Sequence, residues 1–195
     1  MRKLQLGAGG NAAVGWLNTD IDPSGEEIYL DAARRYPFDD ASFHYIFAEH
    51  VIEHISWEAG VRMLQECYRV LAKGGKIRII TPDLSRFLTL LNGQIDAEAQ
   101  QFLIAKSRAE EIPITAVQNA YVFNREFSEW GHKFLYDPPT LRKTFELAGF
   151  KEIKYLRVTD DTDPVFRRAE LRSNHPIPEV RIMNNWESMA FEATR

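Results

Sequence analysis

The chain is 195 residues long and contains a single cysteine, Cys67, so an intramolecular disulfide and a multi-cysteine zinc site are both excluded. It also lacks any uninterrupted run of the roughly 18 apolar residues that a membrane-spanning helix requires. The first residues lead directly into a glycine loop, without the apolar segment of a secretion signal. We therefore expect a cytoplasmic protein with no membrane partner.

An excess of positive charge is missing as well. The 24 lysines and arginines are outnumbered by 28 aspartates and glutamates, which gives a formal net charge of −4. Because such a chain has no overall positive field, we expect no nucleic-acid partner. Internal repeats and low-complexity tracts are also absent, and 45% of the residues are hydrophobic, which together predict one globular domain. The sequence leaves the oligomeric state open.

Short apolar segments separated by glycine- or proline-containing turns fill the first half of the chain. They predict strands near residues 4–6, 16–22, 27–31, 43–48 and 76–81. Apolar residues at helical spacing predict a helix over 57–71, with Gly74 and Gly75 as its C-terminal stop. Alternation of strands and helices is typical of a doubly wound α/β fold with a parallel sheet.

The second half is less regular. We expect helices near 84–91 and 97–108, and then an aromatic-rich loop through residues 121–134. An insertion of this kind suits a substrate lid. Pro138, Pro139 and Thr140 begin a further helix that ends at Gly149. Closing strands are expected at 150–158 and 187–193, joined by a polar connection that carries three prolines.

Chemically distinctive residues follow each of the first three predicted strands: Gly7-Ala8-Gly9, then Asp20, then Asp31. In a doubly wound sheet, ligands bind beyond the carboxyl ends of the strands, where the strand order reverses. Glycine-loop N–H groups can contact a ligand carboxylate, and an acidic side chain can accept both hydroxyl protons of a ribose. The three strand ends therefore predict a site for an adenosine that carries an amino-acid tail.

Four stretches resemble the seven-stranded, class I S-adenosylmethionine (SAM) dependent methyltransferases, in particular a group of small members. They are residues 4–11, 18–23, 37–55 (PFDDASFHYIFAEHVIEHI) and 70–84 (VLAKGGKIRIITPDL), and a weaker likeness extends to residue 150. The resemblance implies a mostly parallel seven-stranded sheet with helices on both faces, an antiparallel C-terminal strand and a lid after the fifth strand. The cofactor half would then be residues 1–84, the lid 85–136 and the closing elements 137–195.

The resemblance also implies SAM as the cofactor and a set of cofactor-binding residues: Gly7, Ala8, Gly9, Asp20, Ile21, Asp31, Ala32, Glu49 and His50. In that set, the glycines lie under the methionine part and Asp20 holds the ribose. Asp31 and Ala32 read the adenine edge, and Glu49 and His50 border the transferred methyl. The chain departs from the family at Gln5, where an acidic residue is common, and in having room for at most a turn or two of helix after the glycine loop.

Methyl transfer requires an aligned acceptor and, for a hydroxyl, a group that removes its proton. His50 and His132 are the candidate bases, because histidine titrates near neutral pH. Trp130, His132 and Tyr136 are the candidate substrate residues. No Asn/Asp-Pro-Pro-Tyr sequence follows the fourth strand, which argues against amide N-methylation, and we expect a small-molecule hydroxyl acceptor such as a sugar or a secondary metabolite.

Other interpretations remain open from the sequence. The glycine loop also fits the dinucleotide pattern G-x-G-x-x-A, although NAD needs a full helix after it. Residues 50–54 match the metalloprotease pattern H-x-x-E-H, and His50, Glu53 and His54 offer ligands for a divalent metal, but we expect no metal. A non-catalytic binding module would keep the same glycines and aspartates.

Overall fold

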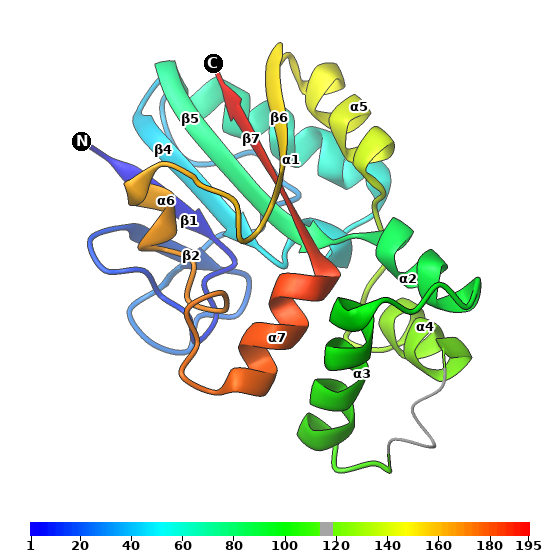
Figure 1. The fold of residues 1–195 in the computed structure, drawn as a ribbon. Helices are drawn as coiled ribbons and strands as arrows, with labels where there is room; N and C mark the ends of the chain where they lie inside the picture. The colour runs from blue at the N-terminus through cyan, green and yellow to red at the C-terminus, as the bar shows by residue number, and fades with distance from the viewer. Residues whose placement is uncertain (114–118) are drawn as a thin grey trace.

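The computed structural model describes residues 1–113 and 119–195, and it contains a seven-stranded sheet flanked by helices (Figure 1). The strand order is β3-β2-β1-β4-β5-β7-β6. The bounds are β1 (Lys3–Leu6), β2 (Leu17–Asp20), β3 (Ile28–Tyr29), β4 (Phe43–Glu49), β5 (Leu71–Pro82), β6 (Glu152–Arg157) and β7 (Ser188–Thr194). β1 to β5 pair in parallel, whereas β7 is antiparallel to both of its neighbours. The expected doubly wound α/β class is confirmed.

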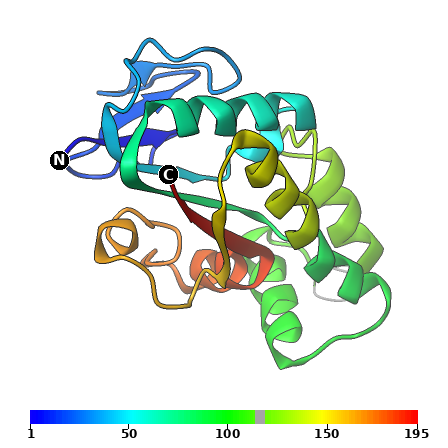
Figure 2. The same cartoon turned by 90° about the horizontal axis from the view of Figure 1, so that it is seen from above.

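Helices cover both faces of this sheet, with α1 and α5 on one side and α6 and α7 on the other (Figure 2). The helical elements are η1 (Ile52–His54), α1 (Trp57–Val70), α2 (Leu84–Leu91), α3 (Ala97–Ala109), α4 (Asn119–Ser128), α5 (Pro138–Ala148), α6 (Pro164–Arg167) and α7 (Pro178–Glu187). A second apolar cluster, built on Phe87, Phe102 and Trp186, joins α2, α3, α4 and α7 into a group beside the main core. In the described residues, no helix is both long and apolar enough to cross a membrane.

Helix α1 forms as the sequence predicts but ends for a different reason. Ser56 caps its first turn by accepting from the Ala59 amide, and Met63, Leu64 and Cys67 are fully buried on the face that meets the sheet. The expected stop at Gly74 and Gly75 is wrong, because the helix ends at Val70 and both glycines lie within β5. Leu71 takes an extended conformation and begins that strand directly.

Two segments expected to be irregular are helical instead. The aromatic-rich stretch from residue 121 contributes most of α4, where Val122 is buried and Tyr121 and Phe123 pack against the α2–α3–α7 cluster. The polar connection between the closing strands contains α6 and α7, each with a proline in its first turn. Pro164 and Pro178 are therefore helix N-terminal residues, which is a position that proline favours, whereas Pro176 lies just before α7.

The chain from Gly7 to Trp16 forms turns without a helix, in keeping with the short spacing in the sequence. The buried Gln5 side chain holds this loop by donating from Nε2 to the Asn11 carbonyl (3.0 Å) and accepting at Oε1 from the Ala13 amide (2.8 Å). A carboxylate cannot donate a hydrogen bond, so the amide in place of the family's acidic residue fits this loop. The pyrophosphate of NAD would lack the helix N-terminus that normally binds it.

We expect Gly60→Ala to destabilise the fold, because the added Cβ would clash with the Tyr136 hydroxyl oxygen. Tyr136→Phe removes that oxygen, which is buried without a hydrogen-bond partner in the described structure. In the Tyr136→Phe background, Gly60→Ala should therefore cost less, although a contact of 3.3 Å between the added Cβ and Cγ1 of Ile52 remains. Urea unfolding of the four proteins in this cycle measures the coupling, and equal effects in both backgrounds would contradict the contact.

Candidate functional site

A cavity of about 520 Å³, here called the first cavity, opens where β1, β2 and β4 end. This is the point where the strand order reverses, since β2 and β4 lie on opposite sides of β1. Its lining is Gly7, Asp20, Ile21, Leu30, Asp31, Ala32, Ala33, His50, Val51, His54, Ile55 and Lys133. The structure thus brings together six of the nine residues expected to bind the cofactor. Ala8, Gly9 and Glu49 are outside this lining, and Ala8 and Glu49 are buried.

Gly7 is required by the close approach of two chain segments. Its φ is +60°, and a Cβ there would clash with Cγ2 of Val51, which follows β4. A side chain would therefore be strained by its backbone conformation as well as overlapping its neighbour. The glycine lets the loop after β1 pack directly against the segment after β4, and both segments line the cavity.

Asp20 at the end of β2 holds the glycine loop in place. Its Oδ2 accepts from the Gly9 amide at 2.8 Å, and its Oδ1 accepts from the Asp22 amide at 2.9 Å. Each carboxylate oxygen has more than one lone pair, so the side chain can still accept from a ribose. The amide of Ala8 donates to the Thr19 carbonyl, so it and Gly9 do not offer the free N–H groups that the sequence suggested for a ligand carboxylate.

His50 stands at the wall of the first cavity in an ion pair with Glu53. The His50 Nδ1 lies 3.0 Å from Oε1 of Glu53, whose side chain is fully buried and also accepts from the Thr81 hydroxyl. Burial lowers the pKa of His50, but the hydrogen bond and charge of Glu53 outweigh it and raise the pKa to about 9. Burial raises the pKa of Glu53, yet the hydrogen bond and charge of His50 bring it below its ordinary value.

This pairing argues against His50 as a general base. At neutral pH its ring is protonated, and its Nε2 lies 3.2 Å from both the Asn184 amide oxygen and the Ser188 hydroxyl. Neither nitrogen has a lone pair to take a proton from an acceptor. The backbone of His50 has a φ of 55°, a conformation uncommon for a residue with a side chain, and such strain is often found at functional sites.

A second cavity of about 430 Å³ lies next to the first and shares His50 and His54 with it. Its lining is completed by Lys106, Ala109, Glu110, Glu126, Trp130, His132, Arg172, Val180, Met183 and Glu187. Of the three expected substrate residues, Trp130 and His132 are in this lining. Tyr136 is not: it is fully buried in the main core, with its hydroxyl against Gly60 of α1.

His132 has the geometry of a neutral histidine with one free nitrogen. Its Nδ1 lies 2.6 Å from the Glu126 carbonyl oxygen, which can only accept, so Nδ1 carries the proton and Nε2 the lone pair. Burial lowers the pKa of His132 below its ordinary value, so the imidazole is uncharged at neutral pH. Burial also raises the pKa of the nearby Glu126 carboxyl to about 8, and the repulsion of Glu187 adds to this rise.

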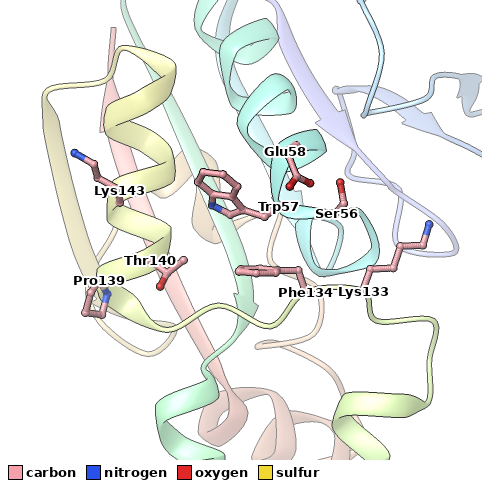
Figure 3. Close-up of a pocket in the computed structure, with 8 residues that line it drawn as sticks. All are labelled: Ser56, Trp57, Glu58, Lys133, Phe134, Pro139, Thr140 and Lys143. Carbon is pink, nitrogen blue, oxygen red and sulfur yellow. The ribbon is translucent and has the colours of Figure 1, made fainter.

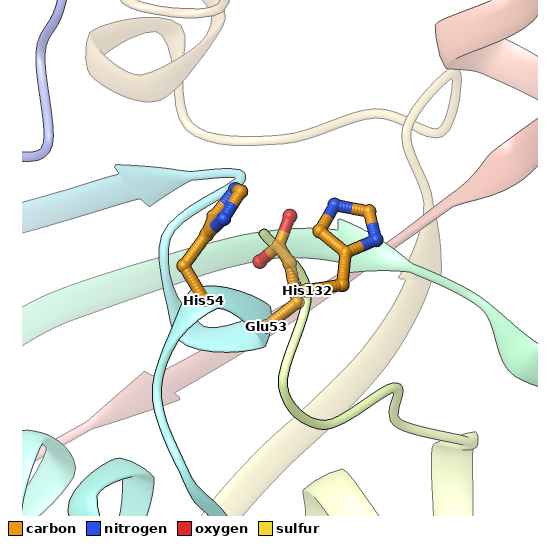
Figure 4. Close-up of side chains that lie close together, drawn as sticks. All are labelled: Glu53, His54 and His132. Carbon is orange, nitrogen blue, oxygen red and sulfur yellow. The ribbon is translucent and has the colours of Figure 1, made fainter. Parts of the chain in front are cut away.

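Glu53, His54 and His132 lie close enough to raise the question of a metal (Figure 4). One ligand atom from each lies within 4.8 Å of the others. Ligand atoms around a single zinc ion are about 3.3 Å apart, because each bond is about 2.0–2.1 Å long. Glu53 is already held by His50 and Thr81, so a metal would have to displace the ion pair. The rings of His54 and His132 pack edge to face, with their centroids 4.9 Å apart.

Comparisons with known proteins agree with this fold. Residues 4–79 match the family model described as a methyltransferase domain. A SAM-dependent methyltransferase from Archaeoglobus fulgidus is 17% identical, with a TM-score of 0.55, over 100% of this chain and 86% of the other. One from Mesorhizobium loti is 14% identical, with a TM-score of 0.53, over 100% of this chain and 90% of the other. One from Thermotoga maritima is 16% identical, with a TM-score of 0.54, over 99% of this chain and 81% of the other. A search of curated proteins gave no match.

The chain thus has the fold of the SAM-dependent methyltransferases, and its residues 4–79 match a methyltransferase domain. The family match ends at residue 79, so it covers the strand ends around the first cavity, while most of the second cavity comes from residues beyond it.

Several residues that line the two cavities were not identified from the sequence. His54 lies in the H-x-x-E-H pattern, where we considered it only as a candidate metal ligand, and it lines both cavities. Lys106 and Glu126 are inward-facing polar residues on α3 and α4, buried to 4% and 5% exposure. Arg172 follows α6. Lys106 and Glu126 each place a polar side chain on a buried helix face. This pattern can be recognised only when the helices that pack against that face are known.

The protein should lose part of its stability above neutral pH. Since the pKa of His50 is raised to about 9, its ion pair contributes fully below about pH 6.5 and is lost as pH rises through 9. The difference in unfolding free energy between wild type and His50→Asn should therefore shrink by up to about 3 kcal/mol between about pH 6 and pH 10. Urea unfolding at each pH measures this difference in unfolding free energy. His44→Asn, at an exposed histidine, is the control, and a constant difference for His50→Asn would contradict the ion pair.

Proposed function

We propose that this methyltransferase transfers the methyl group of SAM to a hydroxyl of a small molecule bound in the second cavity, with His132 as the general base. One observation carries the proposal: the hydrogen bond from Nδ1 of His132 to the Glu126 carbonyl leaves Nε2 with a lone pair on a ring that lines the cavity. The lowered pKa of His132 keeps that lone pair free at neutral pH.

The cofactor occupies the first cavity in this proposal. Asp20 accepts from the ribose hydroxyls, and Asp31 and Ala32 border the adenine, as the family resemblance implies. The methyl group lies at the wall formed by His50 and His54, because those residues line both cavities. SAM supplies an electrophilic methyl on a sulfonium, so the protein must align the acceptor oxygen within about 3–3.5 Å of it.

The reaction is a single displacement at carbon. The acceptor oxygen forms a bond to the methyl carbon while the bond between that carbon and the sulfonium sulfur breaks. The electron pair of the broken bond stays on sulfur, which gives S-adenosylhomocysteine. The hydroxyl proton passes to Nε2 of His132, which becomes an imidazolium. Glu53 neutralises the neighbouring His50 cation, so that the second positive charge forms next to an existing ion pair rather than beside a lone charge.

The second cavity fits a polar small molecule. Its volume of about 430 Å³ is in the usual range for small-molecule sites, and its lining combines basic and acidic side chains, among them Lys106, Arg172, Glu126 and Glu187. Such a wall offers both donors and acceptors to an acceptor rich in hydroxyl groups, such as a sugar derivative. Trp130 and Met183 provide apolar surface for the remainder of the molecule.

We expect Asp20→Ala to weaken binding of S-adenosylhomocysteine by about 100-fold or more. The variant removes the ribose acceptor and also the partner of the Gly9 amide, and a hydrogen bond to a charged group contributes about 1.5–3 kcal/mol. Asp22→Ala, two residues away and exposed, is the matched control and should bind normally. Titration calorimetry with S-adenosylhomocysteine measures the affinity of both variants and of the wild type. Equal affinity in wild type and Asp20→Ala would rule out the ribose assignment.

We expect His132→Ala to lower kcat by roughly 10²- to 10⁴-fold while leaving the affinity for S-adenosylhomocysteine unchanged. In wild type, the rate should rise with pH through a pKa below 6.5 and then level off, because the base must be unprotonated. The assay is release of S-adenosylhomocysteine in a screen of hydroxylated acceptors, with His44→Asn as control. Activity that disappears with a chelator and returns with a divalent metal would favour a metal over the base.

A further inference from the structure

The carboxylate of the cofactor's amino-acid tail lacks an obvious partner in the glycine loop. Four of the loop amides are used inside the protein: Ala8 donates to the Thr19 carbonyl, Gly9 to Asp20, Asn11 to the Ala8 carbonyl and Ala13 to Gln5. The acidic side chains that line the first cavity, Asp20 and Asp31, would repel a carboxylate. A cationic donor elsewhere in the lining would offset this repulsion.

Lys133 is the one lysine or arginine among the residues that line the first cavity. Its side chain is exposed, and among the described residues no carboxylate lies within salt-bridge distance of its ammonium. Its backbone is fixed, because the Lys133 amide donates to the Glu53 carbonyl oxygen at 2.8 Å. The side chain is therefore a free cation on an anchored residue.

Figure 3 shows how this side chain lies relative to a neighbouring surface groove of about 550 Å³ between the first turns of α1 and α5. Lys133 borders both the groove and the first cavity. In the figure, Phe134 and Lys133 point to opposite sides, so that Phe134 lies toward Pro139 and Thr140 while the Lys133 ammonium extends away from them. Of the two lysines on the groove, Lys143 is the one paired locally, with Glu146.

We propose that Lys133 binds the carboxylate of the cofactor's amino-acid tail. This inference rests on the proposed placement of SAM in the first cavity. An ammonium and a carboxylate form a charge-assisted hydrogen bond, which is stronger than a neutral one. Because the backbone of Lys133 is already anchored to Glu53, only the side chain has to be ordered when the cofactor binds.

The test compares two ligands that differ in the amino-acid tail. S-adenosylhomocysteine has the carboxylate, whereas 5′-methylthioadenosine keeps the adenosine and the sulfur and lacks the tail. In calorimetry, Lys133→Met should weaken binding of S-adenosylhomocysteine by about tenfold and leave 5′-methylthioadenosine unchanged. Lys133→Arg should retain most of the affinity because it keeps the charge. Lys143→Met is the matched control and should bind both ligands as the wild type does.

Unchanged binding of S-adenosylhomocysteine by Lys133→Met would overturn the assignment, and so would an equal loss for both ligands, which would indicate a general disturbance of the cavity. Failure of the proposed function has a different signature. If the wild type bound neither ligand, the placement of the cofactor would itself be wrong, and the role of Lys133 would fall with it.

Discussion

The buried carboxylate of Glu53 is the constraint on which the site depends. Its side chain, with no exposed surface, pairs with His50 and accepts from Thr81, and its backbone carbonyl accepts from the amides of Lys133 and Phe134. One residue thus fixes the wall between the two cavities and also docks the segment that carries His132. A buried charge is costly without a partner, so the position of the Glu53 side chain depends on the ion pair remaining intact.

The arrangement explains why the segment after β4 has unusual backbone geometry. It must turn sharply at the end of the strand, present His50 to both cavities and leave room for the loop after β1. The left-handed conformation of His50 provides the turn, and Gly7 allows Val51 to approach where a side chain would clash. The two cavities are therefore joined along one short stretch of chain that lines both.

The sequence predicted those parts of the molecule that local pattern determines. Strand ends marked by glycine or aspartate were found, and Gly7, Asp20 and Asp31 do line one cavity. Long-range packing decided the rest: the aromatic residues after 119 form a helix because α2, α3 and α7 cover it, and Tyr136 is buried because Gly60 leaves space for its hydroxyl. The protonation states of the two histidines depend on partners, Glu53 for one and a carbonyl for the other, that spacing does not reveal.

A crystal structure with S-adenosylhomocysteine bound would test the central claim most directly. We expect the adenosyl group in the first cavity, between Asp20 and Asp31, with the sulfur at the wall formed by His50 and His54 and open toward His132. A sulfur atom directed to solvent, or an adenosyl group bound away from the ends of β1 and β2, would contradict it.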